Sequence, residues 1–259
     1  MNELGYAMAQ EAYALVSQAP GQEGTFTLMD REWEQLDGVV GGQYNQATGL
    51  FAAWLPVDSA RTFLEMGCGC GIAAVTAALR GCPAVTALDI NPAAVRTTEL
   101  NARRHGVRDR VRALESDLFG ALGPDERFDM IFWNSPFIEA PPERVLGSFL
   151  EYHFFDPGYQ MHRRFLAEAP DRLAEGGRLF LGFSEAMGDR VHLEKIADAA
   201  GLRCRTHRQE TFPVPAAELG PDRLYQRYAD GGGMVRIDFT LLELWRAADP
   251  GARDTEGRS

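Results

Sequence analysis

The sequence predicts an α/β protein with a doubly wound, mostly parallel sheet, and two observations lead to this prediction. From Arg61 onward, short apolar runs alternate with amphipathic segments, which is the pattern of consecutive βαβ units. Alternating glycines after the first apolar run predict a tight strand-to-helix turn at the ligand-binding edge of such a sheet. The predicted strands are 62–66, 84–90, 110–114, 129–133 and 178–183, and the predicted helices between the first three are 72–80 and 92–105.

The two ends of the chain depart from this alternation. Residues 3–16 and 45–54 suit two helices, which predicts an N-terminal helical cap. Near the other end, residues 202–212 and 234–245 are strand-like with no convincing helix between them, and they predict a closing antiparallel pair. The last residues are polar and predict a flexible tail. The predicted parts are the cap (1–60), the main domain (61–248) and the tail (249–259).

The composition limits the classes of function. With 259 residues, 45% of them apolar, the chain can bury a full core. A net charge of -11 argues against nucleic acid as a partner, because phosphate-binding surfaces need clustered Lys and Arg. The start lacks a signal-peptide pattern and no long uncharged apolar run occurs, so we expect a cytoplasmic protein without a membrane partner. The four cysteines predict neither a disulfide framework nor a metal site, and the oligomeric state is not predicted.

Three glycines, Gly67, Gly69 and Gly71, alternate between the first predicted strand and the following helix. Glycine lets the backbone turn sharply there and approach a ligand closely. The same residues also fit the dinucleotide fingerprint, with Ala74 in its third position. The loop therefore leaves two cofactor classes open, adenosylmethionine and a nicotinamide dinucleotide.

Two acidic residues farther along the chain bear on this choice. Asp89 ends the second predicted strand, before Ile90 and Asn91, where a carboxylate can accept hydrogen bonds from both ribose hydroxyls in either class. After the third strand, Asp117 can bind an adenine amino group while Leu118 covers the ring. This pair favours adenosylmethionine over NAD.

These elements, in this order, resemble the motifs of class I S-adenosylmethionine-dependent methyltransferases between Arg61 and Ser184. The resemblance implies a Rossmann-like sheet of seven strands, the last antiparallel, and S-adenosylmethionine as cofactor. It also implies that Glu65 and the glycines approach the methionine part of the cofactor. The cofactor-binding candidates are Glu65, Gly67, Gly69, Gly71, Asp89, Ile90, Asn91, Asp117, Leu118 and Asn134.

The segment Asn134, Ser135, Pro136 and Phe137 follows the fourth predicted strand and supplies the catalytic candidates. An Asn side-chain oxygen and the next carbonyl oxygen can both accept from a planar NH2 group and turn its lone pair toward a methyl donor. Proline fixes the turn, and the aromatic ring can pack on the acceptor. The segment resembles the Asn-Pro-Pro-Tyr/Phe motif of small-domain methyltransferases that act on adenine or guanine amines and on glutamine amides, with Ser135 replacing the first proline. An ordinary turn is the alternative.

Residues 138–164 are expected to contact the methyl acceptor, because long loops in compact domains commonly carry function. Their carboxylates suit a small, cationic acceptor such as an amino acid, an amine or a guanidine. His153 is a candidate general base, although a lone histidine is more often structural. The other candidates in this loop are Glu139, Glu143, Glu151, Tyr152, Asp156 and Tyr159.

The sequence thus predicts an N-methyltransferase of a small molecule. A protein side chain or ribosomal component is the alternative acceptor, and an oxidoreductase with a nucleotide cofactor is the alternative from another class. Residues 37–45 are rich in glycine, and the resemblance implies a loop there that closes over the cofactor, with Tyr44 and Asn45 as contacts. The alternative is a helix entry with Asn45 near its N-cap.

Overall fold

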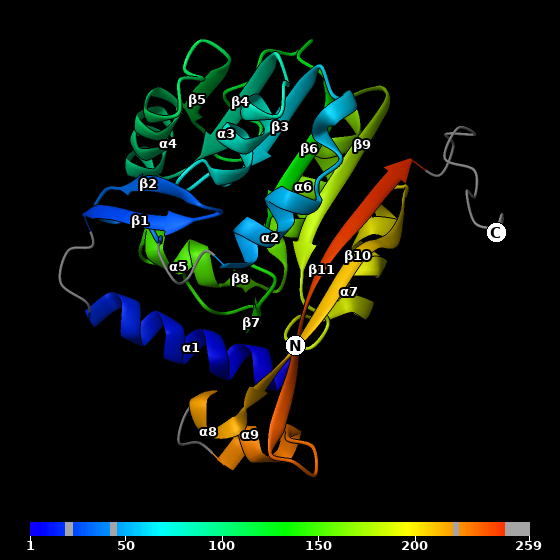
Figure 1. The fold of residues 1–259 in the computed structure, drawn as a ribbon. Coiled ribbons are helices and arrows are strands. Elements are labelled where there is room, and N and C mark those ends of the chain that lie inside the picture. Colours follow the sequence, from blue (N-terminus) through cyan, green and yellow to red (C-terminus); the bar gives the residue numbers. More distant parts are fainter. Residues whose placement is uncertain (19–22, 42–45, 220–222, 247–259) are drawn as a thin grey trace, which may run out of the picture.

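The structure of the chain is a computed structural model that describes residues 1–18, 23–41, 46–219 and 223–246. A seven-stranded sheet with the order β10-β11-β9-β6-β3-β4-β5 forms its centre, and helices lie on both sides of it (Figure 1). The strands of this sheet are β3 (Thr62–Met66), β4 (Ala84–Asp89), β5 (Val111–Glu115), β6 (Phe128–Asn134), β9 (Leu173–Phe183), β10 (Leu202–Pro215) and β11 (Met234–Arg246).

The central strands are buried on both faces, because successive side chains of a strand point to opposite sides of the sheet. In β6, Phe132 packs in the core formed with α2, α3 and α4, whereas Ile131 packs in the core formed with α6 and α7. The doubly wound fold predicted from the sequence is therefore confirmed. The helices are α2 (Gln46–Trp54), α3 (Ile72–Leu79), α4 (Pro92–Arg104), α6 (Gln160–Arg172) and α7 (Arg190–Ala199), and a short 3-10 helix covers Val57–Ser59.

The last two strands close the sheet as an antiparallel pair. β11 pairs antiparallel with both β9 and β10, whereas β9, β6, β3, β4 and β5 are parallel to one another. The prediction of the closing pair is confirmed, but the expectation of no helix between its strands is wrong. Two helices, α8 (Ala216–Leu219) and α9 (Arg223–Tyr228), lie there, and both are too short to show a clear apolar period in the sequence.

The N-terminal region contains the two predicted helices, α1 (Glu3–Gln18) and α2, and also a hairpin that was not predicted. The hairpin strands are β1 (Gly24–Leu28) and β2 (Arg31–Gln35). Their short alternation of polar residues with Phe26, Leu28 and Trp33 was a usable signal for strands.

The anchor of the hairpin is the buried Asn101 of α4. The amide of Asn101 accepts from the backbone N–H of Glu34 at 2.7 Å and donates to the Glu34 carbonyl at 3.0 Å and the Cys70 carbonyl at 2.8 Å. One side chain thus connects the hairpin to the glycine loop.

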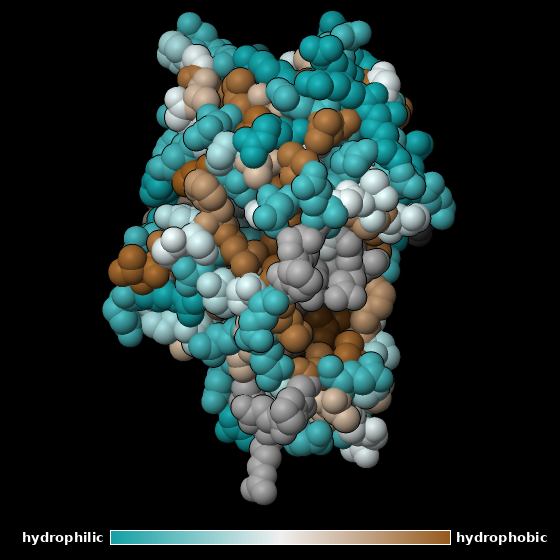
Figure 2. Space-filling model, turned by 90° about the vertical axis from the view of Figure 1, so that its left-hand side faces the viewer, coloured by the Kyte–Doolittle hydropathy of each residue, from teal (hydrophilic) through white to brown (hydrophobic). Residues whose placement is uncertain are grey.

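The segment that the sequence presents as irregular is partly ordered into short elements. They are β7 (Glu139–Ala140), α5 (Phe149–Phe154) and β8 (Asp156–Pro157), and Ser148 caps α5 by accepting from the backbone N–H of Glu151. The surface on the side of the N-terminal hairpin is largely hydrophilic, with a hollow that contains apolar residues (Figure 2). Among the described residues, no helix has the length and apolar character needed to cross a membrane.

Candidate active site

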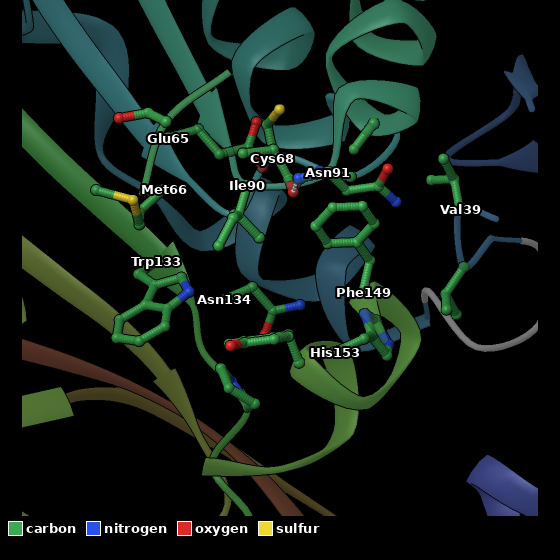
Figure 3. Close-up of a pocket in the computed structure, with 18 of the residues that line it drawn as sticks. Val39, Glu65, Met66, Cys68, Ile90, Asn91, Trp133, Asn134, Phe149 and His153 are labelled. Atoms are coloured by element: carbon green, nitrogen blue, oxygen red, sulfur yellow. Dashed lines mark hydrogen bonds between the residues drawn. The ribbon is translucent and has the colours of Figure 1, made fainter. Parts of the chain in front are cut away.

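A pocket opens at the carboxyl ends of four adjacent parallel strands, β5, β4, β3 and β6 (Figure 3). Open α/β sheets bind ligands at this edge. The pocket brings together residues that are far apart in the sequence. The predicted site residues that line it are Glu65, Gly67, Gly69, Asp89, Ile90, Asn91, Asp117, Leu118, Asn134, Pro136, Tyr152 and His153, whereas Gly71, Ser135 and Phe137 are not among the lining residues.

The three alternating glycines have different surroundings. All three have positive φ, with Gly67 at 60°, Gly69 at 52° and Gly71 at 73°. Gly67 and Gly69 face the pocket, but Gly71 packs against Thr98 of α4, where a Cβ atom would come within 2.7 Å of the threonine side chain. Gly71 thus serves the packing of α3 on α4, and it is not among the residues that line the pocket.

Replacing Gly71 by alanine is expected to lower the free energy of unfolding by roughly 2–4 kcal/mol, because left-handed strain adds to overpacking. Gly69→Ala is the matched control, since Gly69 has the same backbone region but nothing within 4 Å of a Cβ atom. Its cost should be the strain alone, about 1–2 kcal/mol. Urea unfolding of the ligand-free variants measures both values, and equal losses would contradict the packing role of Gly71.

Asp89 is held rigidly at the end of β4. Its carboxylate accepts from the backbone N–H groups of Gly69 at 2.9 Å and Asn91 at 2.8 Å. Burial raises the pKa of Asp89 above its ordinary value, although these two hydrogen bonds oppose the shift. Each oxygen keeps a lone pair with which it can accept from a ligand hydroxyl.

Asp117 lies just beyond β5, at the end of the pocket opposite β6. It forms an ion pair with Arg164 of α6 at 2.9 Å, and both side chains are about half exposed. The next residue, Leu118, is buried and has a positive φ of 47°, which is uncommon for a residue other than glycine. The hydroxyl of Ser116 stabilises this turn by donating to the Leu118 carbonyl at 2.6 Å.

Asn134 is the last residue of β6, and Thr48 of α2 fixes its side chain. The Asn134 amide nitrogen donates to the Thr48 hydroxyl at 2.8 Å, so its oxygen remains available as an acceptor. The hydroxyl of Ser135 donates to the Gly182 carbonyl at 3.1 Å, and the Ser135 carbonyl accepts from the backbone N–H of Phe137 at 2.9 Å. The ring of Phe137 contacts that of Phe183, with 6.1 Å between the centroids, away from the lining of the pocket.

Helix α5 contributes one wall of the pocket through Phe149, Leu150, Tyr152 and His153. Figure 3 shows Phe149 and His153 on the same side of the pocket, opposite the end of β6. The His153 imidazole lines the pocket, and partial desolvation there lowers its pKa below the ordinary value. The side chain is therefore neutral at pH 7.

Glu65 is a buried carboxyl group beneath the glycine loop. It accepts from the backbone N–H of Ala74 at 2.7 Å, and burial raises its pKa to about 8. In the unfolded chain the same group ionises near its ordinary value of 4.5. Ionisation therefore favours the unfolded state, so the stability that Glu65 contributes is complete below pH 4.5 and is lost as the pH rises to 8.

The variant Glu65→Gln is consequently expected to be more stable than the parent in alkaline solution. The gain in Tm of the ligand-free protein should be close to zero near pH 4.5, grow to several degrees by pH 8 and then level off. Thermal unfolding of both proteins from pH 4.5 to 9 measures this difference. A gain that does not change with pH would contradict the raised pKa of Glu65.

The carboxylates expected to attract a cationic acceptor are engaged elsewhere, and this expectation is wrong. None of the four carboxylates of the loop is among the residues that line the pocket. Glu151 pairs with Arg144 at 2.8 Å, Asp156 contacts His162 at 2.6 Å, and Glu139 contacts His192 at 3.0 Å. Glu143 is exposed, and the hydroxyl of Tyr159 donates to the Phe137 carbonyl. A count of acidic residues in the sequence does not reveal such internal partners.

The glycine-rich segment before α2 reaches the pocket through Gly38, Val39 and Val40. The side chain of Asn91 donates to the Gly38 carbonyl at 2.9 Å and so links this segment to the end of β4. The predicted contacts Tyr44 and Asn45 lie outside the described residues.

Several lining residues were not predicted from the sequence. They include Thr48 of α2 and Trp133 of β6, whereas Phe149 of α5 and Arg164 of α6 fall within the predicted contact range 138–164 but were not singled out. Trp133 immediately precedes Asn134, so its position beside the catalytic candidate was a usable signal. The other three reach the pocket only through tertiary packing.

The fold and the site define an α/β protein that binds a nucleoside cofactor. Asp89 lies at the end of β4, Asp117 lies just beyond β5, and the oriented amide of Asn134 lies at the end of β6. Residues 35–210 match the methyltransferase small domain family, and the chain belongs to this family. It is an S-adenosylmethionine-dependent methyltransferase. The residues present fit this cofactor, because Asp89 retains acceptor capacity for ribose and Leu118 is an apolar wall beside Asp117.

Relatives of the chain act on glutamine. A protein of Methanocaldococcus jannaschii, named provisionally as a protein N5-glutamine methyltransferase, is 30% identical over 60% of this chain and 77% of its own length. The release factor glutamine methyltransferase of Bordetella pertussis is 35% identical over 58% of this chain and 57% of its own length. The ribosomal protein uL3 glutamine methyltransferase of Bradyrhizobium diazoefficiens is 34% identical over 60% and 51%. This chain thus spans just over half the length of the two bacterial enzymes.

These relatives overturn the prediction of a small-molecule acceptor, since all three are named for glutamine in proteins. The fold agrees with solved structures. A structure from Pyrococcus horikoshii, titled provisionally as an RNA methyltransferase, covers 93% of this chain and 98% of its own with a TM-score of 0.53 and 14% identity. At that identity the likeness concerns the fold alone.

Proposed function

We propose that the chain methylates the side-chain amide nitrogen of glutamine in a protein. The observation that supports this most directly is the orientation of Asn134 by Thr48 at the pocket, in a family whose relatives act on protein glutamine. A primary amide is planar and carries two N–H donors, which match two acceptor oxygens. The side-chain oxygen of Asn134, which lines the pocket, would supply one of them. We assign the other to the carbonyl of Ser135, which is not itself a lining residue but has a second lone pair besides the one used by Phe137.

Bound S-adenosylmethionine supplies a methyl group on a sulfonium sulfur. Asn134 and Ser135 hold the acceptor nitrogen so that its lone pair faces that methyl, and Pro136 fixes their turn. A bond from nitrogen to carbon forms as the bond from carbon to sulfur breaks, and the nitrogen releases one proton. His153 is neutral and faces the pocket, so it is the side chain that we assign to receive this proton.

The acceptor is tested with methyl-labelled S-adenosylmethionine, purified release factors and ribosomal proteins, and mass spectrometry of the labelled peptides. We expect the methyl group on a glutamine side chain, and no label with the variant Asn134→Ala. Label on another residue type, or no labelled protein from a sample that binds S-adenosylhomocysteine, would contradict the proposal.

The role of His153 is tested by His153→Gln, which keeps a polar side chain but removes the basic nitrogen. We expect kcat to fall about 100-fold with the affinity for S-adenosylhomocysteine unchanged. Tyr152→Phe, on the same wall of the pocket, is the control and should retain most of the activity. If both variants keep the parent kcat, His153 is a wall residue and water takes the proton.

A further inference from the structure

The strand order determines how S-adenosylmethionine lies across the pocket. Asp117 follows β5 and Asp89 ends β4, so these residues would hold the nucleoside part over these two strands. In the order β6-β3-β4-β5, the remaining strands on the other side are β3 and β6. The methionine part, with its carboxylate, would then extend to the ends of β3 and β6, where Gly67 and Asn134 line the pocket.

That end of the pocket offers few donors for a carboxylate. Arg164 is the only Arg or Lys among the described lining residues, and it pairs with Asp117 at the opposite end. The backbone N–H of Cys68 already donates to the Leu88 carbonyl at 3.0 Å, and that of Gly69 donates to Asp89. A buried carboxylate without donors would carry a large desolvation cost.

Trp133 has an unused donor at this place. Its side chain is only 5% exposed and is held between His162 and Phe165, with ring centroids 4.9 Å and 4.7 Å away. Figure 3 shows its indole nitrogen turned toward Asn134 and the interior of the pocket. A Cβ atom on Gly67 would come within 3.1 Å of that nitrogen, which places it beside the first glycine of the loop.

No described residue accepts a hydrogen bond from the Trp133 indole N–H. The nitrogen is not among the buried side-chain atoms that lack a partner in the described residues, so it is open to the pocket, where it can donate to a ligand. A ring locked by packing, with its donor directed into a pocket, is prepared for an acceptor that arrives with a ligand.

We propose that the indole N–H of Trp133 donates to the carboxylate of the methionine part of S-adenosylmethionine. Trp133 is then a cofactor-positioning residue that distinguishes this cofactor from its decarboxylated form, the donor used in aminopropyl transfer. The assignment does not depend on the identity of the methyl acceptor.

The test compares two ligands that differ only in the carboxylate. S-adenosylhomocysteine and its decarboxylated analogue, 5′-(3-aminopropylthio)-5′-deoxyadenosine, are titrated calorimetrically into the parent and into Trp133→Phe, which keeps an aromatic ring against His162 and Phe165. We expect the variant to bind S-adenosylhomocysteine about tenfold or more weakly, while its affinity for the analogue equals that of the parent. Equal weakening for both ligands, or none for either, overturns the proposal.

A second measurement uses the parent protein and so does not depend on the folding of a variant. In a sample with 15N-labelled tryptophan, the indole N–H signal of Trp133 should move downfield with S-adenosylhomocysteine and stay in place with the analogue. The other three tryptophans, Trp33, Trp54 and Trp245, are internal controls. If no indole signal distinguishes the two ligands, the proposal is overturned.

Discussion

Replacing Asn134 by alanine is expected to lower kcat by about 100–1,000-fold or more, because the acceptor nitrogen loses one of the two oxygens that orient it. The affinity for S-adenosylhomocysteine should stay close to that of the parent, since the nucleoside contacts lie on β4 and β5. Single-turnover methylation measures the first quantity and calorimetry the second.

Thr48 supplies the matched control for this prediction. Thr48→Val keeps the shape of the side chain but removes the hydroxyl that accepts from the Asn134 amide at 2.8 Å. We expect about a tenfold loss of kcat with little change in KM, and recovery in Thr48→Ser. If Asn134→Ala weakens cofactor binding as much as it reduces turnover, Asn134 is a cofactor-binding residue rather than a catalytic one.

Replacing Asp89 by alanine is expected to weaken S-adenosylhomocysteine binding by about 100-fold or more. Two hydrogen bonds from ribose hydroxyls to a charged acceptor are lost, each worth about 1.5–3 kcal/mol. The backbone N–H groups of Gly69 and Asn91 also lose their acceptor, which loosens the glycine loop. Calorimetric titration of the folded variant measures the effect.

Asp117→Ala serves as the comparison, because Asp117 is about half exposed and already paired with Arg164. Solvent screening reduces what such a carboxylate contributes, so its loss should cost no more than about tenfold in affinity. A larger loss at Asp117 than at Asp89 would mean that the adenine end, and not the ribose, dominates cofactor binding.

The sequence predicted those parts of the site that lie at the ends of strands. Asp89 and Asn134 each end or directly follow an apolar run, and parallel strands bring such ends to one edge of the sheet. The same reasoning found the glycine loop but could not assign Gly71 to packing, because its neighbour Thr98 comes from another helix. Local patterns thus locate a site without giving each residue its partner.

The parts that were missed depend on contacts between distant segments. Thr48 reaches Asn134 across 86 positions of the chain, and Arg164 reaches Asp117 across 47. The expected cationic acceptor failed for the same reason, because Arg144 and two histidines already pair with three of the four carboxylates of the loop, and the exposed Glu143 does not line the pocket. Charge in a sequence is available to a ligand only where the fold leaves it without a partner.

The contact between Thr48 and Asn134 also bears on how the chain can be divided. The carboxylates that we assign to cofactor binding lie at or just beyond the ends of β4 and β5, but Thr48, which orients the Asn134 amide, comes from α2, before the first strand of that sheet. The same N-terminal segment supplies Phe51 to the core beside Phe132 and residues 38–40 to the wall of the pocket. The N-terminal segment is therefore part of the catalytic apparatus, and the sheet alone does not contain a complete site.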